Sequence, residues 1–430
     1  MNLEKKLYLV FLPIFLSLFL VNCKKKDKEI PQIEFLSPNE NKTFAFGDYI
    51  QVQANISDNK TISAVTVSIV DENQKPILPK FSVSPNSNKY FLDKSFLIDD
   101  VNLKSGKYQI IINAKDGKNE KNAFRIIYIN EIAKSRRGIF VIEAEANSTK
   151  VQLIDSVLNN YTEFQTRNES FACSEISNYL NQLVIAYNSN SKIESYDLRK
   201  NKAAWSQNIS APGASEIFFD LNYRSGIFYS SQTNWLLKGF NASGLAVYNG
   251  YLPNVGVLGK VFATEKYVVA EQVYNGISDI KLQTLNRQTG ALVQTFSSSF
   301  KPFASEEFST DKLIMVGNEG LRIFEVELNN LWTPQQLPTG QVFDIAKLDN
   351  NQYFIAHTNG IYLFRYNPIS LLNFKLGKAY SKIKIDNLNN QLFAVDGNNL
   401  DVISLNTGTI IKSFAFNNPI KEVHVWYNKE

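Results

Sequence analysis

The chain has 430 residues, of which 44% are hydrophobic and 13% aromatic, and its formal net charge is +4. A chain of this length and composition can bury more than one core, so we expect more than one domain. Residues 1–22 and 23–31 hold all but one of the excess positive charges. The remaining body is nearly neutral, which excludes the basic surface that nucleic acid binding requires.

An apolar run from Leu7 to Val21 follows two lysines at the start of the chain and ends just before Cys23. A basic start and an apolar stretch of about 15 residues are typical of a secretory signal peptide and too short for a stable membrane span. We therefore predict that residues 1–22 are removed. The ending Leu20-Val21-Asn22-Cys23 resembles the lipobox of bacterial lipoproteins, which implies that Cys23 is diacylated and becomes the N-terminus.

Residues 23–31 form a charged segment with almost nothing to bury, and we predict a flexible tether there. Acyl chains on Cys23 would anchor the protein without a spanning helix. The cluster Lys24–Glu29 resembles the export signal of surface lipoproteins in Bacteroidota-like bacteria. That resemblance implies a lipid-anchored outer-membrane protein exposed on the cell surface. A periplasm-facing lipoprotein with an ordinary charged linker is the alternative.

Residues 32–131 show short alternating segments bounded by turn residues. Ile50, Val52, Ala54 and Ile56 alternate with polar residues, which predicts strands with one face in a core. The later run Gly106–Gly117, with its Gly-x-Tyr and Ala-x-Asp elements, resembles bacterial immunoglobulin-like domains. The resemblance implies a β-sandwich over residues 32–131 that serves as a spacer or docking module.

Beyond Arg137, units of four strands recur about every 42 residues, a spacing typical of propeller blades. Hairpins such as Leu285–Gly290 and Leu405–Thr409 resemble those of quinoprotein-like and YVTN-type β-propellers, which implies that fold for residues 137–430. Seven apolar segments align as the second strands of successive units. These are Gly138–Ile142, Leu183–Ala186, Ile227–Tyr229, Tyr267–Ala270, Leu313–Val316, Tyr353–Ala356 and Leu392–Val395.

The number of strands predicts how the ring closes. The unit that begins at Gly138 lacks a first strand, while Glu422–Tyr427 at the end of the chain has no unit of its own. We predict that this C-terminal strand completes the N-terminal blade and leaves no open sheet edge. The expected fold is all-β: an immunoglobulin-like sandwich followed by a closed seven-bladed β-propeller.

Few residues point to catalysis or metal binding. With Cys23 acylated, Cys173 is the remaining thiol, and its apolar setting predicts a small buried side chain. His357 and His424 lie on different units, without a carboxylate or cysteine at ligand spacing, so we expect surface or packed rings. We expect no metal site and no cofactor.

Inner strands of a propeller line its central channel, and acidic residues there could act on glycosides or hold a cation. A second candidate set is aromatic, on the loops that join fourth strands to first strands, where rings could bind proteins or sugars. The alternative is that these rings fill gaps between blades. The candidate channel carboxylates are Glu175, Glu216, Glu306, Glu307, Asp344 and Asp386, and the candidate binding aromatics are Tyr251, Phe300, Phe303 and Tyr380.

The sequence therefore favours a non-enzymatic cell-envelope lipoprotein whose propeller is a binding platform for protein or glycan. The implied partners are the membrane, through the lipid anchor, and other envelope proteins or an extracellular protein or polysaccharide. A propeller enzyme that acts on carbohydrate or a related polymer through channel carboxylates is the alternative.

Overall fold

The computed structural model describes residues 29–188, 191–209, 217–233, 235–274 and 280–430. These residues form strands and no helix, which confirms the all-β prediction. No described segment is an apolar helix of a length that would cross a membrane. The chain divides into two compact units, Met1–Ala133 and Lys134–Glu430. The predicted signal peptide and Cys23 lie outside the described residues.

The first unit contains two sheets around one core. Ile50, Val52 and Ala54 are 0% exposed and Ile56 is 1% exposed, so the alternation in the sequence does mark the buried face. One sheet has the order β1-β3-β6, and the other has the order β2-β8-β7-β4-β5 with β2 parallel to β8. The strands are β1 (Gln32–Ser37), β2 (Lys42–Ala45), β3 (Tyr49–Ile62), β4 (Ala64–Val70), β5 (Phe81–Val83), β6 (Ser87–Leu97), β7 (Gly106–Lys115) and β8 (Glu120–Asn130).

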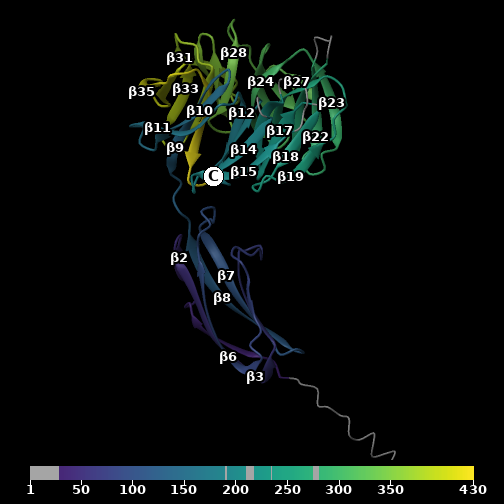
Figure 1. The fold of residues 1–430 in the computed structure, drawn as a ribbon, viewed down its shortest axis with the longest axis vertical. Helices are drawn as coiled ribbons and strands as arrows, with labels where there is room; N and C mark the ends of the chain where they lie inside the picture. The colour runs from purple at the N-terminus through teal and green to yellow at the C-terminus, as the bar shows by residue number, and fades with distance from the viewer. Residues whose placement is uncertain (1–28, 189–190, 210–216, 234, 275–279) are drawn as a thin grey trace, which may run out of the picture. The chain divides into compact units, whose positions relative to one another are not determined.

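The second unit is built from seven four-stranded antiparallel sheets, and we call it the seven-sheet unit. Its strands run from β9 to β36, coloured blue to yellow in Figure 1. From first to fourth strand, three sheets are β12 (Phe171–Ser177), β13 (Gln182–Tyr187), β14 (Lys192–Asp197), β15 (Lys202–Asn208); β16 (Phe218–Arg224), β17 (Ile227–Gln232), β18 (Leu236–Phe240), β19 (Ala246–Gly250); and β20 (Val257–Ala263), β21 (Tyr267–Val273), β22 (Ile280–Asn286), β23 (Leu292–Ser298).

The other four sheets follow the same order. They are β24 (Pro302–Ser309), β25 (Lys312–Gly317), β26 (Gly320–Glu325), β27 (Asn330–Trp332); β28 (Val342–Lys347), β29 (Gln352–His357), β30 (Gly360–Arg365), β31 (Ser370–Leu376); β32 (Lys382–Asp386), β33 (Gln391–Asp396), β34 (Asn399–Ser404), β35 (Ile410–Ala415); and β36 (Ile420–Tyr427), β9 (Arg136–Glu145), β10 (Ser148–Asp155), β11 (Tyr161–Arg167).

Each of the seven apolar segments found in the sequence lies in a second strand. These strands are buried on both faces, because their side chains pack against the neighbouring sheet on each side. One such core joins Ile314 and Val316 of β25 to Tyr353 and Ile355 of β29. Fourth strands such as β15 are mostly exposed. Burial therefore decreases from the second strand to the fourth strand of a sheet.

The end of the chain pairs with the beginning of the seven-sheet unit. β36 runs antiparallel to β9, with Val423 opposite Val141 and Val425 opposite Ile139. The first strands contact one another in the order β12, β16, β20, β24, β28, β32 and β36, and β36 also contacts β12. Residues more than 280 positions apart in the sequence, such as Tyr427 and Arg136, are thus neighbours in one sheet.

Candidate functional site

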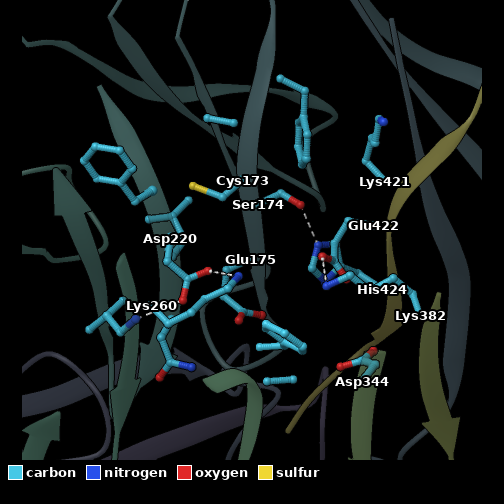
Figure 2. Close-up of a pocket in the computed structure, with 18 of the residues that line it drawn as sticks. Cys173, Ser174, Glu175, Asp220, Lys260, Asp344, Lys382, Lys421, Glu422 and His424 are labelled. Carbon is cyan, nitrogen blue, oxygen red and sulfur yellow. Dashed lines mark hydrogen bonds and ion pairs between the residues drawn. The ribbon is translucent and has the colours of Figure 1, made fainter. Parts of the chain in front are cut away.

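A cavity of about 840 Å³ lies at the N-terminal ends of the first strands of the seven-sheet unit. All seven first strands contribute to its lining, and most of the contributed side chains are charged or polar (Figure 2). Its volume lies within the range of small-ligand and peptide side-chain pockets. The residues that decide its chemistry are Cys173, Ser174, Glu175, Asp220, Asn222, Lys260, Glu306, Asp344, Lys382, Lys384, Glu422 and His424.

The register of the strands arranges these side chains in two layers. Residues two apart on a strand point to the same side of the sheet, and the pairing with second strands places equivalent positions at the same depth. The layer nearer the strand starts contains Cys173, Asp220, Asp344, Lys382 and Glu422, and we call it the mouth layer. Two residues further along, the floor layer contains Glu175, Asn222, Glu306, Lys384 and His424.

Bulges occur in the first strands just before the mouth layer. The pairing with the second strand shifts register there in all first strands except β32. A bulge bends the strand and re-aims the side chains around it. The shifts leave Phe219 and Phe303 without a paired residue opposite, and both rings line the cavity. The bulges therefore place aromatic rings beside the charged layers.

The charges of the mouth layer are mostly compensated. Lys260 Nζ lies 3.1 Å from Asp220 Oδ1, and Lys382 Nζ lies 3.1 Å from Glu422 Oε2. Asp344 accepts hydrogen bonds from the backbone N–H of Ile345 at 3.0 Å and of Ile383, on the next first strand, at 2.9 Å. Burial acts to raise the pKa of Glu422, but the neighbouring lysines outweigh it and lower this pKa to about 2. The carboxylates of this layer are thus held by ion pairs and backbone hydrogen bonds within the protein.

The floor layer is less well compensated. Burial is the largest cause that raises the pKa of Glu175 to about 7 and the pKa of Glu306 to about 6. Burial also disfavours the charged form of Lys384, but the surrounding carboxylates outweigh it, and its pKa lies above the ordinary value. Glu175 and Glu306 are therefore the groups whose charge a bound ligand would change most, while Lys384 stays protonated between them.

His424 and Ser174 form a hydrogen bond across the junction between β36 and β12. Nε2 of His424 lies 2.8 Å from Oγ of Ser174, and the two residues are 3% and 7% exposed. Burial lowers the pKa of His424 to about 4, so the ring is neutral near pH 7. Cys173, next to Ser174, is buried as predicted, and burial holds the pKa of its thiol well above the ordinary value. Among the described residues, no group of three or more His, Cys, Asp or Glu side chains is arranged to hold a metal ion.

The structure brings three of the six candidate carboxylates together in the cavity, namely Glu175, Glu306 and Asp344. Glu216 lies outside the described residues. Glu307 points elsewhere and forms an ion pair with Arg224 at 2.6 Å.

The prediction that Asp386 is a free channel carboxylate is wrong. Asp386 is 0% exposed at the opposite end of β32, where Arg136 Nη1 donates to Oδ2 and the Tyr427 hydroxyl donates to Oδ1, both at 2.8 Å. Asn389 Nδ2 also donates to Oδ2, at 2.7 Å. A carboxylate with this many protein donors is a structural group.

Two of the four candidate aromatics are core residues, which corrects the prediction that they are surface anchors. Phe300 is 1% exposed within a core cluster, and Tyr380 is 0% exposed, with its hydroxyl donating to Asp401 Oδ2 at 3.0 Å. They fill space between sheets, as the alternative proposed. Phe303 does line the cavity, and Tyr251 is 67% exposed on a loop outside the cavity lining.

The sequence reasoning missed Asp220, the four lysines of the cavity, Glu422 and the role of His424. A signal for them exists, because polar residues two apart interrupt otherwise apolar first strands. The pairs are Cys173 and Glu175, Asp220 and Asn222, Lys382 and Lys384, and Glu422 and His424. Because residues i and i+2 share a face of a strand, each pair marks one side of the sheet as polar.

Comparisons with known proteins identify the N-terminal unit and give similarity for the rest. Residues 31–112 match the family model described as a bacterial Ig domain. No curated protein matches the chain. The chain is thus all-β with a bacterial immunoglobulin-like domain near its N-terminus, and it is similar to solved β-propellers.

Three solved structures illustrate this similarity. The β-propeller domain of Cps50 (Swd1) from Myceliophteria thermophila is 12% identical, with 66% of this chain and 99% of that chain covered and a TM-score of 0.47. BamB from Moraxella catarrhalis is 13% identical, with 67% and 92% covered and a TM-score of 0.41. Apo AztD from Citrobacter koseri is 12% identical, with 67% and 84% covered and a TM-score of 0.47.

Proposed function

We propose that the protein is a non-enzymatic cell-envelope lipoprotein and that its seven sheets form a closed seven-bladed β-propeller that binds a protein or a glycan. In this proposal, acylated Cys23 anchors the chain in the outer membrane, and the charged tether favours display on the cell surface over an orientation facing the periplasm. Residues 32–131 act as the spacer. The function of the molecule is then recognition by a rigid scaffold.

The observation that supports this function is the cavity in the seven-sheet unit. Its floor layer presents Glu175, Glu306 and Lys384 together, with few protein partners, while Asp220 and Glu422 of the mouth layer form ion pairs with lysines. Buried charges that serve only stability are normally paired and hydrogen-bonded. Groups that keep hydrogen-bonding capacity in a cavity of this size are suited to a ligand.

Site-specific photocrosslinking tests the binding function. A benzophenone amino acid at Lys421, which is exposed and lines the cavity, should capture a defined partner in intact cells. The matched control carries the same group at Leu328, which is 71% exposed on the turn between β26 and β27, outside the cavity lining. Crosslinks at Lys421 and not at Leu328 would support a platform; a protein recovered alone from both variants would contradict it.

Lipid anchoring is tested separately. Metabolic labelling with a palmitate analogue should mark the wild-type protein, and Cys23→Ser should abolish the label and release the chain from membranes. Protease treatment of intact cells then reports the leaflet. A chain that survives would contradict surface display while leaving the anchor intact.

The alternative is an enzyme that acts on carbohydrate or a related polymer, and one observation favours it. A general acid for glycoside cleavage must hold its proton near neutral pH, and burial raises the pKa of Glu175 to about 7. Turnover assays on polysaccharides decide between the two functions. Product that disappears in Glu175→Gln or Glu306→Gln would support the enzyme, whereas binding without product would support the platform.

A further inference from the structure

The cavity carries an excess of negative charge. Six carboxylates and four ammonium groups line it, and the low pKa of His424 leaves its ring neutral near pH 7. With all carboxylates ionised, the lining therefore has two uncompensated negative charges. The carboxylates belong to Glu145, Glu175, Asp220, Glu306, Asp344 and Glu422, and the ammonium groups to Lys260, Lys382, Lys384 and Lys421.

The excess charge is located on Glu175 and Glu306. The other inner carboxylates have the ion pairs and backbone hydrogen bonds of the mouth layer, and Glu145 is exposed at the rim. Within the described parts of the chain, the Glu175 carboxylate accepts one hydrogen bond, from the backbone N–H of its own neighbour Ile176 at 2.9 Å. Glu306 receives a backbone hydrogen bond from Lys347. Both glutamates thus retain acceptor capacity towards the cavity.

Charged groups on the neighbouring first strands act on the pKa values of the two glutamates. Glu175 is influenced by Lys384, Glu422 and Asp220, in this order of effect, and Glu306 is influenced by Lys384, Asp344 and Lys347. Lys384 is shared between the two, and its ammonium group forms no ion pair or hydrogen bond with the residues that the structure describes. One ammonium cannot neutralise both carboxylates.

A second, smaller cavity beside the first also contains a carboxylate with too few hydrogen-bond donors. It has a volume of about 360 Å³ and shares Phe219, Lys260 and Phe303 with the cavity. Glu271, 2% exposed, lines it; Oε2 accepts the backbone N–H of Lys260 at 3.0 Å, while Oε1 has no partner among the described residues. A buried acceptor without a donor is costly, so this site too favours a ligand that donates hydrogen bonds.

We propose that the cavity receives a basic side chain, lysine or arginine, of a partner protein, with its cationic group between Glu175 and Glu306 and its apolar part against Phe219 and Phe303. This inference rests on the proposed binding function. The glutamates supply the negative charge that the cation needs, and aromatic faces add a favourable cation–π contribution. An anionic group would instead meet two uncompensated carboxylates.

Proton release must accompany such binding. Because burial raises the pKa of Glu175 to about 7 and that of Glu306 to about 6, both are partly protonated in the free protein below neutral pH. A cation binds the ionised forms, so its affinity rises with pH up to about 7. Binding of an anion to Lys384 would show the opposite dependence.

The experiment uses a capped pentapeptide with a central lysine, and the same peptide with norleucine in its place, titrated calorimetrically into the mature protein. We expect the lysine peptide to bind about tenfold more tightly at about pH 7.5 than at about pH 5.5, with proton release detected in buffers of different ionisation enthalpy. Glu175→Gln and Glu306→Gln should each weaken binding about tenfold, and Lys384→Met should strengthen it.

Several outcomes would overturn the inference. The first is equal binding of the norleucine and lysine peptides. The second is loss of binding in Lys384→Met together with tighter binding in the glutamine variants. The third is preferential binding of a chitosan oligomer, which would assign the cation to a glycan. Thermal unfolding of each variant confirms that it folds. A partner crosslinked at Lys421 whose capture is unchanged by both glutamine variants would refute the basic side chain and leave the binding function standing.

Discussion

β32 carries two charged groups in opposite surroundings, Lys384 at its centre, in the cavity, and Asp386 at its C-terminal end. The two residues share a face of the strand, yet Asp386 receives donors from Arg136, Tyr427 and Asn389, whereas the ammonium group of Lys384 has no hydrogen-bond or ion-pair partner among the described residues. Burial of a charge without partners is unfavourable for folding alone. This difference indicates that Asp386 stabilises the seven-sheet unit, whereas Lys384 is available to a ligand.

β36 contributes both to the surroundings of Asp386 and to the cavity, so its removal should have the largest effect on stability. It supplies Tyr427 to Asp386, Glu422 and His424 to the cavity, and the only strand that pairs with the inner edge of β9 in the described structure. Deletion of residues 420–430 should abolish the cooperative thermal unfolding of the seven-sheet unit, measured by circular dichroism. The control lacks only Glu430. If the protein that lacks residues 420–430 unfolded like the wild type, β36 would not have the role that we assign to it.

Asp386→Ala should cost about 3–5 kcal/mol of unfolding free energy, because it leaves the Arg136 side chain, 7% exposed, as an unpaired buried charge. Urea denaturation at neutral pH measures this loss. Glu306→Ala, in the cavity, is the matched variant and should cost much less because its carboxylate has one backbone hydrogen bond. Equal losses of unfolding free energy in the two variants would show that Asp386 is no more important for stability than the cavity carboxylates.

Much of this architecture is predictable from local patterns, and the site is predictable only in part. The second strands of the seven-sheet unit are recognisable because each is a continuous apolar run between turn residues. In the first unit, the alternating residues Ile50 to Ile56 mark the buried face of β3. Asp386 and Glu175 cannot be told apart in this way. Both are acidic residues on first strands, and what separates them is the position of Arg136, about 250 residues away in the sequence.

The aromatic candidates fail for a related reason. Phe300 and Phe303 are three residues apart on one connection, but a bulge in β24 leaves Phe303 at the cavity while Phe300 packs into a core. Bulges add one residue to one strand and change which side chains share a face. A single sequence does not show where they occur.

Within the cavity, the compensated and the uncompensated carboxylates should affect stability in opposite directions as pH changes. Glu175 has a folded pKa raised to about 7, so the folded state binds more protons than the unfolded state and stability falls as pH rises from about 4.5 to 7. Glu422 has a folded pKa lowered to about 2, so its contribution is present above about pH 4.5 and is lost as pH falls towards 2.

Substitution by glutamine separates these effects. Glu175→Gln should raise stability by about 1–2 kcal/mol near pH 8 and leave it unchanged near pH 4.5, whereas Glu422→Gln should lower stability near pH 8. Urea denaturation across that pH range provides both values. The same sign for the two variants at pH 8 would contradict the division of the cavity into compensated and uncompensated carboxylates.

Tyr380→Phe should have a smaller effect, about 1 kcal/mol, because the phenyl ring still fills its site and only the hydrogen bond to Asp401 is lost. Asp401 retains Lys378 Nζ at 2.8 Å and Ser413 Oγ at 2.6 Å. Binding at the cavity should be unaffected. A variant that folds with wild-type stability yet loses its partner would return Tyr380 to the set of binding residues.

Tyr251 gives the smallest expected change in stability and the clearest separation of structure from recognition. Its ring is 67% exposed, and its backbone N–H, which donates to Gly290 O at 3.0 Å, remains in Tyr251→Ala, so this substitution should shift the unfolding free energy by less than about 0.5 kcal/mol. Its effect on partner capture is then informative without correction for folding. Loss of partner capture in Tyr251→Ala would show that the binding surface extends beyond the cavity. Unchanged capture would limit the binding surface to the cavity, which the bulged first strands line.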